Sequence, residues 1–306
     1  MKIAVTGCTG FIGSHLVDAL VKEHDVVGLA HYNHDFRLGN LQQDIELRWG
    51  DIRDEKYCLD SIFDCDVLVH LAALIDVPYS FKYPRSYIDT NIIGTHNLAM
   101  ACVVQDIPMI HTSSSEVYGD YGINAMESTY QEANSPYAAS KIAADNLILS
   151  YRKAMGLEAL ILRPFNTYGP RQSTRAFIPT MIKRLGWAGK FIQSGNLYPK
   201  RDLTYVEDTV RAYVMAIESK GWENADVLNL GTAESHSMEE VLRLLMEILG
   251  VQKEIVYNQD IMRPTGAEVP ELRSLNDNAV KTIGWNPWYT LEQGLRKTCE
   301  AYTSAH

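Results

Sequence analysis

A glycine-rich turn behind the first apolar segment constrains the fold of this chain more than any other feature. Lys2 to Thr6 has the pattern of a buried strand and Ser14 to Lys22 that of an amphipathic helix, with three glycines close together between them. In that context the first glycine permits a tight turn, the second lets the backbone approach a pyrophosphate, and the third lets helix and strand pack closely. The free N–H groups at the start of such a helix attract phosphate. The residues predicted to contact a dinucleotide here are Gly7, Gly10, Phe11, Ile12 and Gly13.

The same alternation of apolar segment, turn and helical pattern continues through the first half of the chain. Further strands are expected at Val26 to Ala30, Val67 to Leu71, Met109 to Ser113 and Leu157 to Arg163. Strands that alternate with helices form parallel sheets with right-handed crossovers and helices on both faces. The sequence therefore predicts an α/β fold with a doubly wound parallel sheet of the Rossmann type.

The alternation stops after Pro164, where loop-rich segments begin. Ser237 and Glu240 have the spacing of a capping box, which predicts a helix start. Thr290 and Gln293 predict a second one near the C-terminus. We expect a smaller α+β substrate domain in this half. The expected division is residues 1–165 plus roughly 202–231 for the dinucleotide domain, and roughly 166–201 plus 232–306 for the nucleotide-sugar domain.

Composition and charge argue against several classes of function. The 306 residues carry a net charge of −10, which is unfavourable for binding nucleic acid or an anionic membrane. No apolar run approaches the length of a membrane span or a signal peptide, so we expect a cytoplasmic protein. The five cysteines are odd in number and include no CxxC pair, so we expect neither a metal site nor a disulfide framework.

Two further positions bear on the adenosine half of the cofactor. An acid at the end of the second strand usually binds a ribose hydroxyl and favours NAD, but this position is His31. The cofactor is expected to be NAD, and the missing acid leaves NADP open. Asp51 and Ile52, after the third strand, form a candidate adenine clamp. On its own, Asp51 is equally compatible with a simple turn.

The segment from Ser135 to Lys141 carries the candidate chemistry. Ser135 is a favourable helix cap and Pro136 a favourable first helical residue, so a helix is expected to begin here. Tyr137 and Lys141 then lie four residues apart on one helix face. An ammonium group beside a phenol lowers the pKa of the phenol, so we expect Tyr137 to act as a base near neutral pH.

Together these motifs resemble the extended short-chain dehydrogenase/reductase family, and the resemblance covers nearly the whole chain. It is carried by the glycine loop, Asp51-Ile52, His70-Leu71-Ala72-Ala73, Asn91, the Tyr137/Lys141 pair and Arg163 to Arg171. The resemblance implies that Ser114, at the end of the strand from Met109, assists Tyr137. It further implies cofactor contacts from Leu71, Ala72, Ala73, Asn91, Tyr137, Lys141 and Pro164. The substrate contacts it implies are Asn166 at a phosphate, Arg201 and Arg263 at a diphosphate, and Arg175, for which a plain surface charge is an equal alternative.

The pair Ser115-Glu116 bears on the subclass within that family. Sugar-nucleotide 4,6-dehydratases carry Asp-Glu at this position, UDP-glucose 4-epimerases lack the glutamate, and UDP-glucuronate decarboxylases share Ser-Glu. The segments Ala72 to Ser80 and Phe165 to Arg175 look most like nucleotide-activated N-acetylglucosamine 4,6-dehydratases of the legionaminic acid type. The leading hypothesis is a 4,6-dehydratase that acts on UDP- or GDP-N-acetylglucosamine.

The resemblance implies a redox-neutral reaction. Tyr137 takes the C4 hydroxyl proton while hydride passes from C4 to the nicotinamide, and Glu116 takes the C5 hydrogen. Water then leaves from C6 and the hydride returns to that carbon. Because Ser115 is a poor acid, the proton for the leaving hydroxyl comes from Glu116, a bound water or Tyr137. The alternatives are a UDP-sugar 4-epimerase, a UDP-glucuronate decarboxylase, a UDP-N-acetylglucosamine 5,6-dehydratase, or a dinucleotide-sensing protein without activity.

Two helical stretches, Tyr87 to Val104 and Ser140 to Lys153, carry many apolar side chains. Members of the resembled family often pair such helices into an intersubunit four-helix bundle, so a homodimer is expected. The alternative is that both apolar stripes face only the sheet.

Overall fold

The computed structural model describes residues 1–31, 39–258 and 268–304. Its centre is a seven-stranded parallel sheet, which confirms the predicted doubly wound α/β fold. Across the sheet the strands are β11 (Val227–Leu230), β6 (Ala159–Pro164), β5 (Met109–Thr112), β4 (Val67–His70), β1 (Lys2–Thr6), β2 (Asp25–His31) and β3 (Glu46–Gly50). The strand order reverses between β1 and β4, and ligands of such sheets bind at the carboxyl ends of the strands beside that point.

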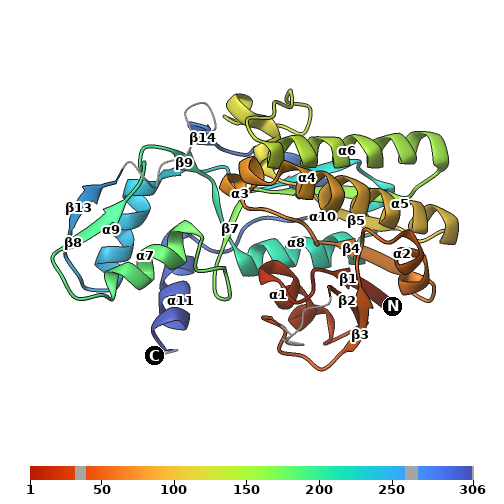
Figure 1. Cartoon of the computed structure of the whole chain (residues 1–306), viewed down its shortest axis with the longest axis horizontal. Coiled ribbons are helices and arrows are strands. Elements are labelled where there is room, and N and C mark those ends of the chain that lie inside the picture. The colour runs from red at the N-terminus through yellow and green to blue at the C-terminus, as the bar shows by residue number, and fades with distance from the viewer. Residues whose placement is uncertain (32–38, 259–267, 305–306) are drawn as a thin grey trace.

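Helices cover both faces of the sheet (Figure 1). One face carries α2 (Glu55–Ile62), α5 (Gly94–Gln105) and α6 (Pro136–Met155), and the other carries α1 (Phe11–Leu20) and α8 (Val206–Glu218). Because side chains alternate along a strand, Leu68 packs toward α5 and α6 while Val67 and Val69 pack toward α1 and α8. This two-sided burial explains why the central strands are apolar almost throughout.

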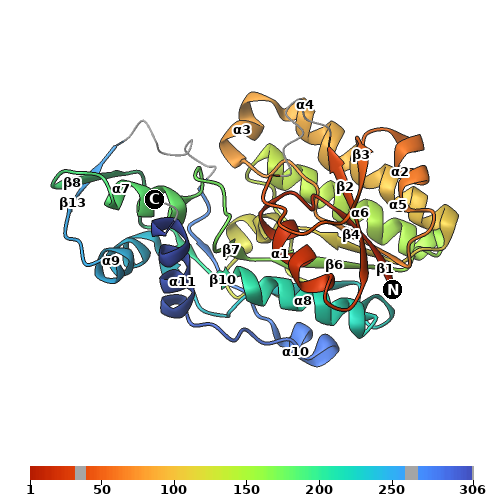
Figure 2. The ribbon, with the colours of Figure 1, turned by 90° about the horizontal axis from the view of Figure 1, so that it is seen from below.

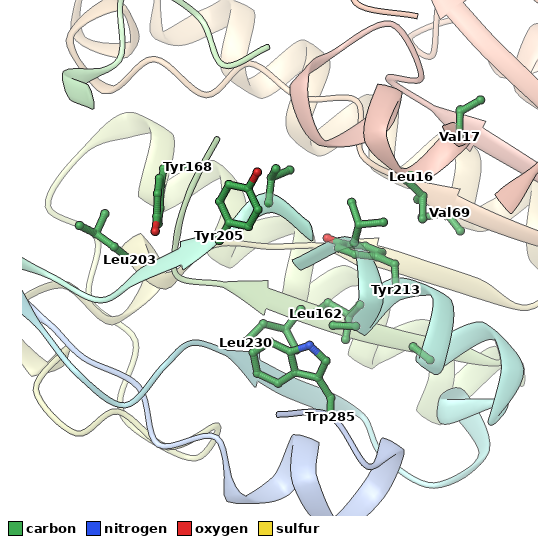
Figure 3. Close-up of a cluster of buried hydrophobic side chains, with 14 of the residues drawn as sticks. Leu16, Val17, Val69, Leu162, Tyr168, Leu203, Tyr205, Tyr213, Leu230 and Trp285 are labelled. Carbon is green, nitrogen blue, oxygen red and sulfur yellow. The ribbon is translucent and has the colours of Figure 1, made fainter. Parts of the chain in front are cut away.

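A large apolar cluster fills the face beneath α1 and α8 and continues into the second half of the chain (Figure 3). Leu16 of α1, Leu162 of β6 and Tyr213 of α8 are fully buried in it. Trp285 is also fully buried, and its indole N–H donates to the carbonyl of Asp208 at 2.8 Å. The second half of the chain is therefore joined to the sheet through a common core.

The second half forms a smaller lobe at one end of the molecule (Figures 1 and 2). It contains small sheets ordered β10-β7, β12-β9-β14 and β13-β8. The capping boxes predicted at Ser237 and at Thr290 are both present, at the starts of α9 and α11. The elements are β7 (Asn166–Tyr168), α7 (Phe177–Leu185), β8 (Phe191–Ser194), β9 (Lys200–Arg201), β10 (Leu203–Tyr205), β12 (His236–Ser237), α9 (Met238–Ile248), β13 (Glu254–Tyr257), β14 (Glu271–Leu272) and α11 (Leu291–Thr303).

The connections at the carboxyl edge of the sheet are short and partly irregular. They are α3 (Val77–Lys82), α4 (Pro84–Tyr87), the π-helical segment η1 (Ile88–Ile93) and the 3₁₀ segment η2 (Ser115–Tyr121). Two other short elements, η3 (Gly221–Glu223) and α10 (Asp277–Ile283), do not belong to these connections. The helical stretch predicted from Tyr87 to Val104 is thus π-helical in its first part. π-helical turns are rare and often mark functional sites, and this one carries Asn91.

Within the described ranges, no helix is long and apolar enough to cross a bilayer. All five cysteines are buried and free. No three His, Cys, Asp or Glu side chains gather as a metal site would require, in the part of the chain that the structure describes.

Candidate active site

The glycine loop between β1 and α1 approaches neighbouring backbone so closely that side chains do not fit. Gly7 has a φ of +68°, and a Cβ there would lie 3.0 Å from the amide nitrogen of Ala72. A Cβ at Gly13 would lie 2.1 Å from the carbonyl oxygen of Gly7. Gly10 caps α1 without any side-chain hydrogen bond, so the first N–H groups of the helix are left for a ligand. This cradle fits a pyrophosphate, as the sequence predicted.

Thr6, the last residue of β1, fixes the opposite wall of this cradle. Its hydroxyl oxygen accepts hydrogen bonds from the amides of Leu71 and Ala72, both at 3.0 Å, and lies 2.8 Å from Nδ1 of His70. Leu71, Ala72 and Ala73 were predicted to contact the cofactor, and this hydroxyl holds the start of their segment against the glycine loop. Thr6 was not predicted as a site residue, although a hydroxyl side chain directly before the first glycine could have indicated it.

Asn91 ties the same segment to α6. Its Oδ1 accepts from the amide of Leu74 at 2.8 Å, and its Nδ2 donates to the carbonyl of Leu74 and to Ser140 Oγ, both at 2.9 Å. Asn91 was predicted to contact the cofactor. In the structure its side chain is buried and is engaged with its own chain, so it positions the wall of the site.

The adenosine end of the cradle is formed by charged side chains. His31 ends β2, and its Nε2 lies 3.3 Å from Oδ2 of Asp51. Arg53 donates to the same carboxylate at 2.5 Å, and this hydrogen bond lowers the pKa of Asp51 to about 2. Ile52 follows β3, and its carbonyl accepts from Asn97 at 3.0 Å. His31, Asp51 and Ile52 therefore lie together after the ends of β2 and β3, and their contact with the adenosine of NAD stays a prediction.

The first turns of α6 hold the Tyr137/Lys141 pair. Ser135 accepts from the amide of Ala138 at 3.0 Å and so caps the helix, as predicted. Tyr137 and Lys141 are both buried, and Lys141 Nζ donates to the carbonyl of Thr112 at 2.8 Å. Burial lowers the pKa of Lys141 to about 8.

The environment of Tyr137 differs from the prediction in one respect. Burial raises the pKa of its phenol above the ordinary value, and a hydrogen bond with Ser114 partly opposes that effect. The nearby charge of Glu116 raises it further. The prediction of a lowered pKa is therefore wrong, because the desolvation of the phenol outweighs its favourable contacts.

The segment that follows β5 brings Ser114 and Glu116 to Tyr137. The strand ends at Thr112, so Ser114 lies beyond it and does not end it. Ser114 caps η2, and its hydroxyl accepts from the amide of Glu116 at 3.2 Å. Ser115 and Glu116 are buried. One short segment thus places a hydroxyl and a carboxylate beside the phenol.

The predicted substrate residues are only partly gathered at this site. Asn166 begins β7, just after Pro164 ends β6, and its buried Oδ1 has no hydrogen-bond partner within the described ranges. Arg175 is 81% exposed, and its guanidinium lies 3.9 Å from Asp76. Arg201 is buried and donates to the carbonyl of Val269 at 2.9 Å and to Glu268 at 3.1 Å. Arg263 lies outside the described residues.

Comparison with known proteins decides the family. A family model described as GDP-mannose 4,6 dehydratase matches residues 4–298 of this chain. The chain belongs to the epimerase/dehydratase family of short-chain dehydrogenases/reductases. The resemblance inferred from the sequence is thereby confirmed.

Relatives within the epimerase/dehydratase family carry different activities. GDP-6-deoxy-D-mannose reductase of Pseudomonas aeruginosa is 30% identical over 305 residues, 96% of this chain and 95% of that protein. dTDP-glucose 4,6-dehydratase of Mycobacterium tuberculosis is 30% identical over 317 residues, 99% of this chain and 93% of that protein. The structure of UDP-glucuronic acid 4-epimerase from Bacillus cereus with UDP-glucuronic acid and NAD has a TM-score of 0.90 and 30% identity, with both chains covered in full. Family membership alone therefore does not select one reaction.

Proposed function

We propose that this member of the epimerase/dehydratase family is an NAD-dependent sugar-nucleotide 4,6-dehydratase. The observation that carries the proposal is the position of Glu116, a buried carboxylate close enough to Tyr137 to raise the pKa of its phenol. A 4-epimerase needs one proton-transfer group at C4, whereas a dehydratase needs a second at C5. The site supplies both a phenol and a carboxylate.

NAD fits the cradle formed by the glycine loop and the segment after β4. Gly7 and Gly13 admit no side chain, and the uncapped start of α1 faces the place where a pyrophosphate would lie. Asp51 and His31 would hold the adenosine end, and Lys141 the nicotinamide ribose. NAD held there would supply the redox chemistry of the reaction, in which a hydride from C4 of the sugar is returned to C6.

Tyr137 and Glu116 carry out the proton transfers of the proposed reaction. Tyr137, assisted by Ser114, removes the proton of the C4 hydroxyl, and the resulting ketone acidifies the hydrogen at C5. Glu116 removes that hydrogen, and hydroxide departs from C6 as water. Ser115 ionises too weakly to supply the proton for the leaving group, so Glu116 delivers the proton that it has just taken. When the hydride has returned to C6, C5 takes up a proton from solvent, and Tyr137 releases to solvent the proton that it took from the C4 hydroxyl.

We propose a UDP- or GDP-N-acetylglucosamine substrate, held partly by Asn166. The unpartnered Oδ1 of Asn166 calls for a donor, and a sugar hydroxyl offers one. The amide also carries N–H donors that suit a phosphate. Arg175 and Arg201 are the further proposed substrate contacts among the described residues.

One observation favours a UDP-sugar 4-epimerase as the second candidate. Ser115 stands where the resemblance drawn from the sequence places an aspartic acid in 4,6-dehydratases, and this leaves one acid fewer for the loss of water from C6. Epimerisation needs no such acid, because only C4 is oxidised and reduced. UDP-glucuronate decarboxylation is another outcome that product mass distinguishes. A 5,6-dehydration also removes one water, so NMR of the product separates it from 4,6-dehydration.

A panel of nucleotide sugars read by mass spectrometry tests the proposal. We expect a product lighter by one water from UDP- or GDP-N-acetylglucosamine, and no such product with Tyr137→Phe. Tyr87→Phe is the matched control, because the Tyr87 ring packs against Tyr137 with centroids 6.3 Å apart while its hydroxyl donates elsewhere, to Asp76. A product of unchanged mass would establish epimerisation instead, and loss of carbon dioxide decarboxylation.

We also propose that the enzyme forms a homodimer through α5 and α6. Ile93 is 42% exposed and Val104 67% exposed, and both lie at the ends of α5 on the outer side of the molecule. A face that served only the sheet would bury these side chains. Light scattering at micromolar concentration should give twice the mass of the chain, and a monomer there contradicts the pairing.

A further inference from the structure

A row of buried polar side chains crosses the sheet beneath α5 and α6, next to a cluster of buried apolar side chains. Strand register explains the row, because paired residues on neighbouring parallel strands point to the same face. Thr6, His70 and His111 are register partners on β1, β4 and β5, and Arg163 and Asn229 are register partners on β6 and β11. Arg163 lies two residues beyond Ile161, the partner of His111, and so on the same face. Asp145 of α6 pairs with Arg163 over this row. Buried polar groups are costly unless they are paired, so the pairing within this row is informative.

Asp145 is the only carboxylate of that row, and one of its oxygens is strongly engaged. Oδ2 accepts from Ser113 Oγ at 2.9 Å and from Arg163 at 3.0 and 3.1 Å. Oδ1 lies 3.8 Å from Nε2 of His111 and makes no hydrogen bond within the described ranges. The side chain is fully buried. Hydrogen bonds to Oδ2 therefore fix the carboxylate in position, whereas Oδ1 still has room for a hydrogen bond.

Lys141 lies one helical turn before Asp145 on the same face of α6. The negative charge of Asp145 raises the pKa of Lys141, against the burial that lowers it to about 8. Asp145 acts on Lys141, and Lys141 acts on His70 of β4 and His111 of β5. Arg163 of β6 pairs with Asp145, and Glu116 of η2 acts on Tyr137 of α6. Burial lowers the pKa of both histidines, so they are neutral near pH 7.

Asp145 therefore lies between two buried cations, Lys141 and Arg163. Burial raises the pKa of this carboxyl group, and the two cations oppose that effect. Arginine does not release its proton in proteins, whereas a buried lysine does so readily. We propose that Asp145 is a positioning residue of the active site, the buried counter-charge that keeps Lys141 in its charged form beside Tyr137. It acts through Lys141 and does not touch the substrate. The proposal rests on the proposed function in that Tyr137 and Lys141 serve the reaction.

Asp145→Asn tests this role because it keeps the shape of the side chain and removes its charge. An opposite charge nearby typically shifts a pKa by about 1–3 units. We expect the alkaline limb of kcat/KM to move to lower pH by about one unit or more. The titration of the Lys141 amine, followed by NMR of labelled lysine and assigned by its loss in Lys141→Met, should move by the same amount. Asp145→Glu should restore both towards their original positions.

Asp208→Asn is the matched control. Asp208 is equally buried and also pairs with an arginine, Arg211 at 2.8 Å, but it lies on α8 on the opposite face of the sheet. This variant should lose stability without moving the alkaline limb or the Lys141 titration. If Asp145→Asn behaves in the same way as Asp208→Asn, Asp145 is merely structural and the proposal is overturned.

Two further results distinguish the role of Asp145 from a failure to fold and from a failure of the proposed function. If Asp145→Asn does not fold, the carboxyl carbon of Asp145 is titrated in the wild-type chain, with its resonance assigned through Ser113→Ala. An ionised carboxylate at pH 7 supports the proposal, and a protonated one overturns it. If no nucleotide sugar is turned over but the Lys141 titration still shifts in Asp145→Asn, the proposed function fails while the electrostatic role of Asp145 stands.

Discussion

The cofactor side and the substrate side of this site differ in how far the chain satisfies its own polar groups. On the cofactor side, the Thr6 hydroxyl and the Asn91 amide form hydrogen bonds with the backbone of the wall segment that follows β4. On the substrate side, the buried Oδ1 of Asn166 has no partner in the described part of the chain, and Arg175 is 81% exposed. The walls of the cradle are held by hydrogen bonds within the chain, whereas Asn166 keeps a buried oxygen that has no partner among the described residues.

This difference has an energetic meaning. A preformed cradle loses little conformational freedom on binding, so more of the interaction energy appears as affinity. The cofactor is therefore expected to be held tightly through repeated turnovers. Substitutions on the cofactor side should disturb the protein itself, whereas substitutions on the substrate side should change substrate binding and leave the fold intact.

The largest effect among the binding variants is expected at Gly13. In Gly13→Ala the new Cβ meets the Gly7 carbonyl, and backbone cannot yield as a flexible side chain would. Overpacking of this kind costs about 1–3 kcal/mol, so cofactor affinity should fall about 5- to 150-fold and the melting temperature should drop. Calorimetric titration with NAD measures the affinity.

Gly186→Ala is the control for that substitution, because the nearest atom to its new Cβ would lie 3.5 Å away. It should bind NAD as the wild type does. If Gly13→Ala also retains wild-type affinity and stability, the cradle is not preformed in the way the comparison requires.

A smaller effect is expected on the substrate side. Asn166→Ala removes an amide that makes no Oδ1 hydrogen bond within the described residues, so the fold should keep its stability. A typical hydrogen bond contributes about 1 kcal/mol, which predicts a KM for the nucleotide sugar raised about fivefold with unchanged NAD affinity. The exposed Asn146 on α6, changed to alanine, should alter neither quantity. A destabilised Asn166→Ala with unaltered KM would place Asn166 among the structural residues.

The most gradual effect is the pH dependence set by Lys141. Because its pKa falls from an ordinary 10.5 to about 8 in the folded chain, activity should decline above about pH 8 as the ammonium is lost. Between pH 8 and 10.5 the unfolded chain holds more protons, so this group makes stability rise with pH while activity falls. Rate profiles and denaturant midpoints measured across this window should therefore diverge. If the rate and the denaturant midpoint declined together, unfolding of the protein would explain the loss of activity above pH 8.

The comparison also shows what the sequence reveals. Local patterns predicted the glycine loop, both capping boxes and the start of α6 at Ser135, because each depends on residues a few positions apart. Thr6 and Asp145 escaped notice, because their importance arises from strands and a helix brought together across the sheet. The direction of the Tyr137 pKa was wrong, since burial of a side chain is a property of the whole fold.

Glu116 carries the central claim, and Glu116→Gln in deuterated water tests it most directly. The amide keeps the size of the side chain and removes its basicity, and loss of a general base typically lowers the rate by about two to four powers of ten. Wild-type enzyme supplied with UDP- or GDP-N-acetylglucosamine should place deuterium at C5 of a 4-keto-6-deoxy product, which NMR detects. Glu116→Gln should bind the substrate and oxidise C4 but form almost no dehydrated product. Near wild-type dehydration by Glu116→Gln, or a wild-type product without deuterium at C5, would contradict the account.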